Sequence, residues 1–141
     1  MSHPSESTFN MRVRCTQELP NEEQGRMLGE YYRAGKQVFK VIVGREYLVY
    51  GMFFQAGVPW VQLLEEFGYI YPVPLCLFEI VDGRVSKYWK VRYDEKGVTL
   101  WPPSFSREFY LDDLIEGKRE ILEDFQRVRE MIEQEANSVI S

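Results

Sequence analysis

Histidine and cysteine, which commonly carry out catalysis, are rare in this chain of 141 residues. The single histidine, His3, lies in a polar N-terminal segment, and no G-x-S-x-G motif occurs, which argues against Ser-His-Asp and Cys-His mechanisms. Cys15 and Cys76 are too few for a disulfide framework or a four-cysteine zinc site, and both fall at alternating apolar positions. We interpret both cysteines as buried apolar residues and expect the protein not to be an enzyme.

Carboxylates are the remaining candidates for a metal site. Asp112 and Glu116 fall one helical turn apart, and Glu116, Gly117 and Lys118 have the E-x-K order of metal-dependent nucleases. That element needs a strand, whereas here it falls at the end of a predicted helix, so solvated charge is the better interpretation. The chain also lacks the Walker and Rossmann glycine patterns. We therefore expect neither a metal nor another cofactor.

The negative charge of the chain is concentrated in its last quarter. Residues 104–141 carry 10 acidic and 5 basic side chains, whereas residues 1–103 carry 12 of each. An acidic surface repels nucleic acid and favours a basic protein partner, although a solvated helix explains the same pattern. One small basic patch is too limited to change our expectation that nucleic acid is not a partner. It comprises Arg84, Lys90 and Arg92 beside Tyr88 and Trp101.

Aromatic residues are the main candidates for binding. Pro72 and Pro74 stiffen the segment 67–75, in which Tyr69 and Tyr71 offer flat amphipathic surfaces. We expect this segment and the tryptophans to line a groove for a protein or an uncharged ligand. Beside such a groove, Arg84 or Arg92 is placed to hold an anion. A lid that seals one end of the sheet is an equally good interpretation. The predicted binding residues are Trp60, Tyr69, Tyr71, Tyr88, Trp89, Arg84 and Arg92.

The elements that must position these residues begin after a flexible tail, predicted over residues 1–10. Alternation of apolar and polar residues predicts a first strand over 11–18. A capping box of Asn21 and Gln24 then predicts the start of a helix, and Gly35 is placed to end it.

An alternation of period two from Gln37 onward predicts a sheet built from hairpins. The strongest turn signal is Asp82-Gly83, whose type I′ turn would place Cys76 opposite Trp89 in the interior. Other turns are expected at Gly44-Arg45, at Gln55-Ala56-Gly57 and over 94–97. The expected cross-strand pairs include Ile42 with Tyr47, Met52 with Trp60, Ile80 with Val85, and Val98 with Tyr93.

The C-terminal part is predicted to be helical. Ser104 or Ser106 caps a short helix that ends at Gly117. In the longer helix that follows, one apolar stripe is formed by Ile121, Phe125, Val128 and Ile132. We therefore predict a single α+β domain over 11–141. It is an antiparallel β-meander of about six strands, with an N-terminal helix and a long C-terminal amphipathic helix packed on one face.

These features favour a small acidic protein-interaction domain that acts by occlusion, as an immunity-type inhibitor or an adaptor does. The alternative is a small-molecule-binding module with an aromatic pocket between sheet and helices. Exposed rings would support the first hypothesis and a closed concavity the second. An enzyme would need paired carboxylates or a reactive tyrosine in a pocket. Because no apolar run is long enough for a signal peptide or a membrane span, we expect a cytoplasmic location.

Overall fold

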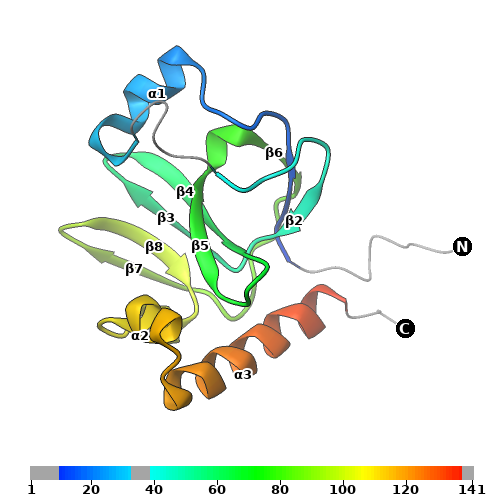
Figure 1. The fold of residues 1–141 in the computed structure, drawn as a ribbon, viewed down its shortest axis with the longest axis vertical. Helices are drawn as coiled ribbons and strands as arrows, with labels where there is room; N and C mark the ends of the chain where they lie inside the picture. The colour runs from blue at the N-terminus through cyan, green and yellow to red at the C-terminus, as the bar shows by residue number, and fades with distance from the viewer. Residues whose placement is uncertain (1–9, 33–38, 138–141) are drawn as a thin grey trace, which may run out of the picture.

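A computed structural model describes residues 10–32 and 39–137 of the chain. They contain eight strands and three α-helices (Figure 1). The strands are β1 (Arg12–Cys15), β2 (Glu46–Leu48), β3 (Gly51–Gln55), β4 (Val58–Leu64), β5 (Ile70–Pro74), β6 (Phe78–Asp82), β7 (Lys90–Asp94) and β8 (Gly97–Trp101). The helices are α1 (Glu22–Leu28), α2 (Tyr110–Glu116) and α3 (Arg119–Ala136), with short 3-10 turns at η2 (Gly29–Tyr31), η3 (Leu75–Leu77) and η4 (Pro103–Ser106).

Parts of the predicted N-terminal region lie outside the described residues. These are residues 1–9 of the predicted tail, His3 among them, and the predicted helix end at Gly35. Asn10, which we assigned to the tail, is instead fully buried. The capping box is confirmed, because the Asn21 side chain accepts a hydrogen bond from the Gln24 amide and the Gln24 side chain accepts one from the Asn21 amide.

The strands form two antiparallel sheets. One has three strands in the order β2-β1-β6, and the other has five in the order β5-β4-β3-β8-β7. In Figure 1, α2 and α3 lie together at one end of the molecule and α1 lies at the opposite end. The predicted α+β class with antiparallel strands is confirmed, and the one predicted meander is replaced by two sheets.

The predicted hairpin at Asp82-Gly83 is wrong. β6 pairs with β1, and residues 83–89 then carry the chain across to β7 in the other sheet. Cys76 and Trp89 are therefore not cross-strand neighbours. A dipeptide that tolerates a turn permits a reversal, but it does not decide which strand becomes the partner. Among the residues expected inside this hairpin, Ile80 and Val85 are exposed.

The turn near Gly44-Arg45 is centred one residue earlier than predicted. Gly44 has a φ of 90°, and the Arg45 amide donates to the Ile42 carbonyl at 3.0 Å. The strand that follows, β2, pairs with β1, so Tyr47 lies opposite Val13. The expected ladder between Ile42 and Tyr47 is therefore wrong.

The loop between β3 and β4 is also shorter than predicted. It contains only Ala56 and Gly57, with φ angles of 51° and 79°, which is the conformation of a two-residue type I′ turn. Trp60 consequently lies opposite Phe53 and not opposite Met52. In contrast, the predicted hairpin between β7 and β8 is confirmed, with Tyr93 opposite Val98.

The C-terminal helices follow the predicted pattern except at one cap. No side chain caps α2, because Phe109 precedes it with a φ of 61° and neither predicted serine takes that position. Gly117 ends α2 with a φ of 79°, as predicted. The four residues of the predicted α3 stripe are all buried. They are Ile121, Phe125, Val128 and Ile132.

The buried apolar residues form two clusters. The strand core packs the sheets against each other and against α1; among its members are Val13, Cys15, Leu28, Trp60, Leu63 and Trp89. The helix core packs α2 and α3 onto the five-stranded sheet; among its members are Tyr50, Phe105, Tyr110, Phe125 and Ile132. Phe53 links the two clusters, since its ring lies 6.2 Å from Trp60 and 5.8 Å from Trp101, measured between centroids.

Candidate functional site

Two of the predicted binding residues are interior residues. Trp60 and Trp89 are 4% and 8% exposed and belong to the strand core. Neither indole Nε1 has a hydrogen-bond partner among the described residues. Their rings therefore support the fold and do not line an open groove.

The segment 67–75 contains an edge strand. Its residues 70–74 form β5, which pairs with β4 on one side only. Proline is tolerated at such an edge because the missing amide hydrogen is not needed on the solvent side, which explains Pro72 and Pro74. Tyr69 packs against the helix core, whereas Tyr71 borders a cavity between the two sheets.

The remaining predicted residues lie in separate places. Arg84 Nη2 forms an ion pair with Asp82 Oδ2 at 2.7 Å, and Arg92 lies on the exposed strand β7 opposite Thr99. Tyr88 borders a hollow beside α3. The structure does not bring the seven predicted residues together into one groove.

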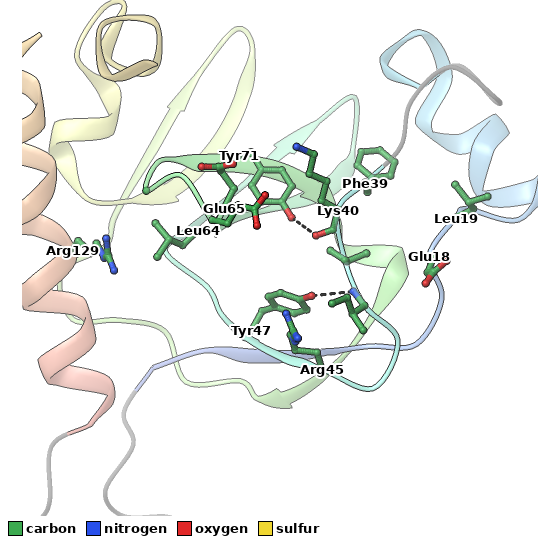
Figure 2. A pocket seen from close by; sticks show the side chains of 14 residues that line it. Glu18, Leu19, Phe39, Lys40, Arg45, Tyr47, Leu64, Glu65, Tyr71 and Arg129 are labelled. Carbon is green, nitrogen blue, oxygen red and sulfur yellow. Dashed lines mark hydrogen bonds between the residues drawn. The ribbon is translucent and has the colours of Figure 1, made fainter. Parts of the chain in front are cut away.

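A cavity of about 780 Å³, which we call the inter-sheet pocket, lies between the two sheets. Its walls come from both sheets, from the segment before β2 and from α3 (Figure 2). Side chains that line it include Phe39, Tyr47, Leu64, Glu65, Tyr71 and Arg129. A cavity of this volume falls in the range of ligand and side-chain binding pockets, roughly 300–1,000 Å³.

Two tyrosines of the inter-sheet pocket are held in place by the backbone between them. The Tyr71 hydroxyl donates to the Lys40 carbonyl at 2.8 Å, and the Tyr47 hydroxyl accepts from the Ile42 amide at 2.9 Å (Figure 2). Burial raises the pKa of Tyr71 to about 12, with smaller effects from Tyr47 and nearby acids. Tyr71 therefore stays protonated at neutral pH, and both rings are rigid walls before any ligand arrives.

Glu65 and Arg45 line the inter-sheet pocket with opposite charges and form no ion pair with each other. The buried Oε1 atom of Glu65 has no hydrogen-bond partner among the described residues. Arg45, on the other side of the pocket in Figure 2, makes no ion pair within residues 10–32 and 39–137. Arg129 is different, because its Nε donates to Glu133 Oε2 at 2.7 Å.

Sequence reasoning found Tyr71 but missed the other main walls of the inter-sheet pocket. Tyr47 was expected only as a cross-strand partner of Ile42, and neither Phe39 nor Glu65 was a candidate binding residue. No local signal distinguishes them, because the pocket is built from segments that are far apart in the chain, from Glu18 to Arg129.

Three further observations bear on the class of protein. In the described ranges no group of three or more His, Cys, Asp or Glu side chains is arranged to hold a metal ion. Among those same residues, no helix has the length and apolar character needed to cross a membrane. Comparison with known proteins gives no significant match, either to a family model or to a curated protein or solved structure.

Proposed function

We propose that this protein is a binding module that docks a segment of a protein partner in the inter-sheet pocket. The observation that carries the proposal is the pocket itself, a cavity of about 780 Å³ whose tyrosine walls are already fixed by hydrogen bonds to the backbone. Rigid walls lower the entropy cost of binding, because few side chains have to be ordered when the partner arrives.

The rim of the inter-sheet pocket supports a protein partner. Leu19 and Ile42 line it and are 54% and 50% exposed. Val43 and Phe67, each next in sequence to a lining residue, are 53% and 72% exposed. Apolar side chains gathered around a concavity are typical of surfaces that bury against a partner.

The unpaired charges indicate what the docked segment carries. Glu65 lines the pocket and makes no ion pair with another described residue, so a basic group of the docked segment would neutralise its carboxylate. A carboxylate near Arg45 would neutralise the exposed cation on the other side. The partner segment therefore presents an apolar side chain between one basic and one acidic group, and occlusion of that segment is the proposed action.

The proposal is tested with peptides selected from a random library on the wild-type protein. Ile42→Glu places a charge on the pocket rim and should weaken binding of the selected peptides about tenfold or more. Val85→Glu is the matched control, because Val85 is 56% exposed and lies outside the inter-sheet pocket. Fluorescence polarisation measures both. Equal losses in the two variants, or no loss in Ile42→Glu, would contradict the proposal.

Binding of a small molecule is the second candidate, because the volume of the inter-sheet pocket also suits one. A small molecule would therefore bind between the two sheets. It would not bind against Trp60 and Trp89, which are buried in the strand core. A fragment library screened by NMR distinguishes the two candidates. Fragments that bind tightly in the pocket, together with a failure to select peptides, would favour the small molecule.

A further inference from the structure

A second concavity lies beside the start of β7, which is an edge strand of the five-stranded sheet. We call it the basic hollow; its volume is about 360 Å³. It is bounded by residues 87–90, where the chain enters β7, by residues 102–104 after β8, and by α3. The residues that matter for its chemistry are Lys87, Lys90, Arg127, Tyr88, Pro103 and Met131.

Among the residues that the structure describes, the charged side chains that line the basic hollow are all cationic. Lys87, Lys90 and Arg127 line it, and none of the described aspartates or glutamates does so. Lys87 and Lys90 make no ion pair with any residue in the described ranges. Such a concentration of positive charge is notable in a chain with a formal net charge of −5. Clefts lined by one sign of charge concentrate ions of the opposite sign.

Two acidic side chains that bond to lining residues of the basic hollow already have hydrogen-bond donors. Asp124 accepts hydrogen bonds from Arg127 and from the Tyr110 hydroxyl. Glu135 is buried, and its Oε2 accepts from the Lys87 backbone amide at 2.9 Å. Among the described residues, neither carboxylate forms an ion pair with the Lys87 or Lys90 ammonium group.

The basic hollow also has an apolar wall. The Tyr88 ring is partly buried, and the Lys87 Nζ lies 5.2 Å from its centroid. Pro103 and Met131 add further apolar surface. A flat group stacked on a tyrosine gains favourable contact without losing many rotamers, and prolines offer a rigid opposing surface.

We propose that the basic hollow binds a small organic phosphate with a flat ring. The phosphate lies between the lysines, and the ring packs on the apolar wall that Tyr88 forms with Pro103 and Met131. A phosphate monoester carries between one and two negative charges near neutral pH, which suits two free ammonium groups better than a single carboxylate does. The hollow is separate from the inter-sheet pocket, since the two share no lining residue, so this site is independent of the proposed peptide docking.

Isothermal titration calorimetry with three probes tests the ligand chemistry. Adenosine monophosphate has both groups, adenosine lacks the phosphate, and glycerol 3-phosphate lacks the ring. We expect adenosine monophosphate to bind at least about fivefold more tightly than either of the others, since both contacts add to the affinity. Binding of adenosine with equal affinity, or of glycerol 3-phosphate with equal affinity, would overturn the proposed mode of recognition.

Protein variants test the location of the site. The double variant Lys87→Gln and Lys90→Gln should weaken binding of adenosine monophosphate about tenfold. Lys96→Gln is the control, because Lys96 is exposed in the turn between β7 and β8 and lines neither the inter-sheet pocket nor the basic hollow. All these lysines are at the surface, so the variants are expected to fold, and thermal melting checks this. Unchanged affinity in the double variant, or an equal loss in Lys96→Gln, would overturn the proposal.

Discussion

The strand core and the helix core are held together by different kinds of interaction. Strands that surround the strand core are joined by backbone ladders, as between β1 and β6 or between β4 and β5. The helix core joins α3 to the rest of the chain both by packing of apolar side chains and by side-chain hydrogen bonds. The Tyr50 hydroxyl bonds to Glu133 Oε2 at 2.5 Å, and the Tyr110 hydroxyl bonds to Asp124 Oδ2 at 2.8 Å.

A third tie anchors the end of α3. Glu135 Oε1 accepts hydrogen bonds from Asn10 Nδ2 at 3.0 Å and from Ser86 Oγ at 2.6 Å, while its Oε2 accepts from the Lys87 amide. Asn10, Ser86 and Glu135 are all buried, so each bond replaces a lost contact with water. Substitution of a single polar side chain should therefore weaken the attachment of α3. The pairing of the strands depends on backbone hydrogen bonds and should be affected much less.

The largest effect is expected from removing the apolar anchor of α3. Phe125→Ala should lower the free energy of unfolding by about 3–5 kcal/mol, because it leaves a cavity where a 3% exposed ring packs against the sheet. Chemical denaturation measures the change. Leu122→Ala on the same helix is the control, since Leu122 is 45% exposed and its loss should cost under about 1 kcal/mol. Equal effects of the two substitutions would mean that α3 is not docked through its apolar stripe.

A smaller effect is expected at the polar tie. Glu135→Ala should cost about 2–3 kcal/mol, because it leaves the buried donors of Asn10 and Ser86 without their acceptor. Glu123→Ala is the control, as it makes the same change at an exposed position of α3. Both variants are compared by urea denaturation. Equal stability of the two variants would show that the buried carboxylate contributes little to the attachment of the helix.

The smallest expected effect is a dependence on pH. Burial raises the pKa of Asp124, but hydrogen bonds from Tyr110, Arg127 and Ser104 outweigh it and hold the pKa below its usual value. A lowered folded-state pKa contributes stability above the unfolded pKa, which is about 3.9 for aspartate, and this stability is lost as the pH falls through the folded value. The wild type should therefore lose more stability than Asp124→Asn as the pH falls below about 4.

Stability curves for the wild type and Asp124→Asn, measured from pH 6 downward, check this expectation. Protection of the β4 and α3 amides against hydrogen exchange sharpens the comparison between the cores. On acidification, the α3 amides should lose protection before those of β4, since the ladders of β4 contain no group that titrates in acid. Simultaneous loss of protection would contradict the difference between the two cores.

Features that depend on neighbours in the chain were predictable. The capping box needs only Asn21 and Gln24, three residues apart, and the α3 stripe repeats with the period of a helix. The hairpin between β7 and β8 has its two-residue connection and both strands within one short stretch. In each case the interacting groups are so close in sequence that no distant segment competes for them.

Features that depend on a choice between distant partners were not predictable. β6 was expected to pair with the residues just after Asp82-Gly83, yet it pairs with β1, where Arg14 Nη1 also reaches Glu79 Oε1 at 2.6 Å. The local turn signal and the distant strand compete, and burial of Val13 and Cys15 depends on the distant one. Trp89 is buried as expected, but in the strand core and not opposite Cys76.

The sequence by itself determined the α+β class, the amphipathic C-terminal helix, the Asn21–Gln24 capping box and the β7–β8 hairpin, because short-range periodicity and backbone preferences act within a few residues. Only the tertiary structure decided that there are two sheets, that Trp60 is buried in the strand core and does not line a groove, and that the inter-sheet pocket exists. Its lining residues extend from Glu18 to Arg129, and they become neighbours only after each strand has selected its partner among many with similar apolar patterns.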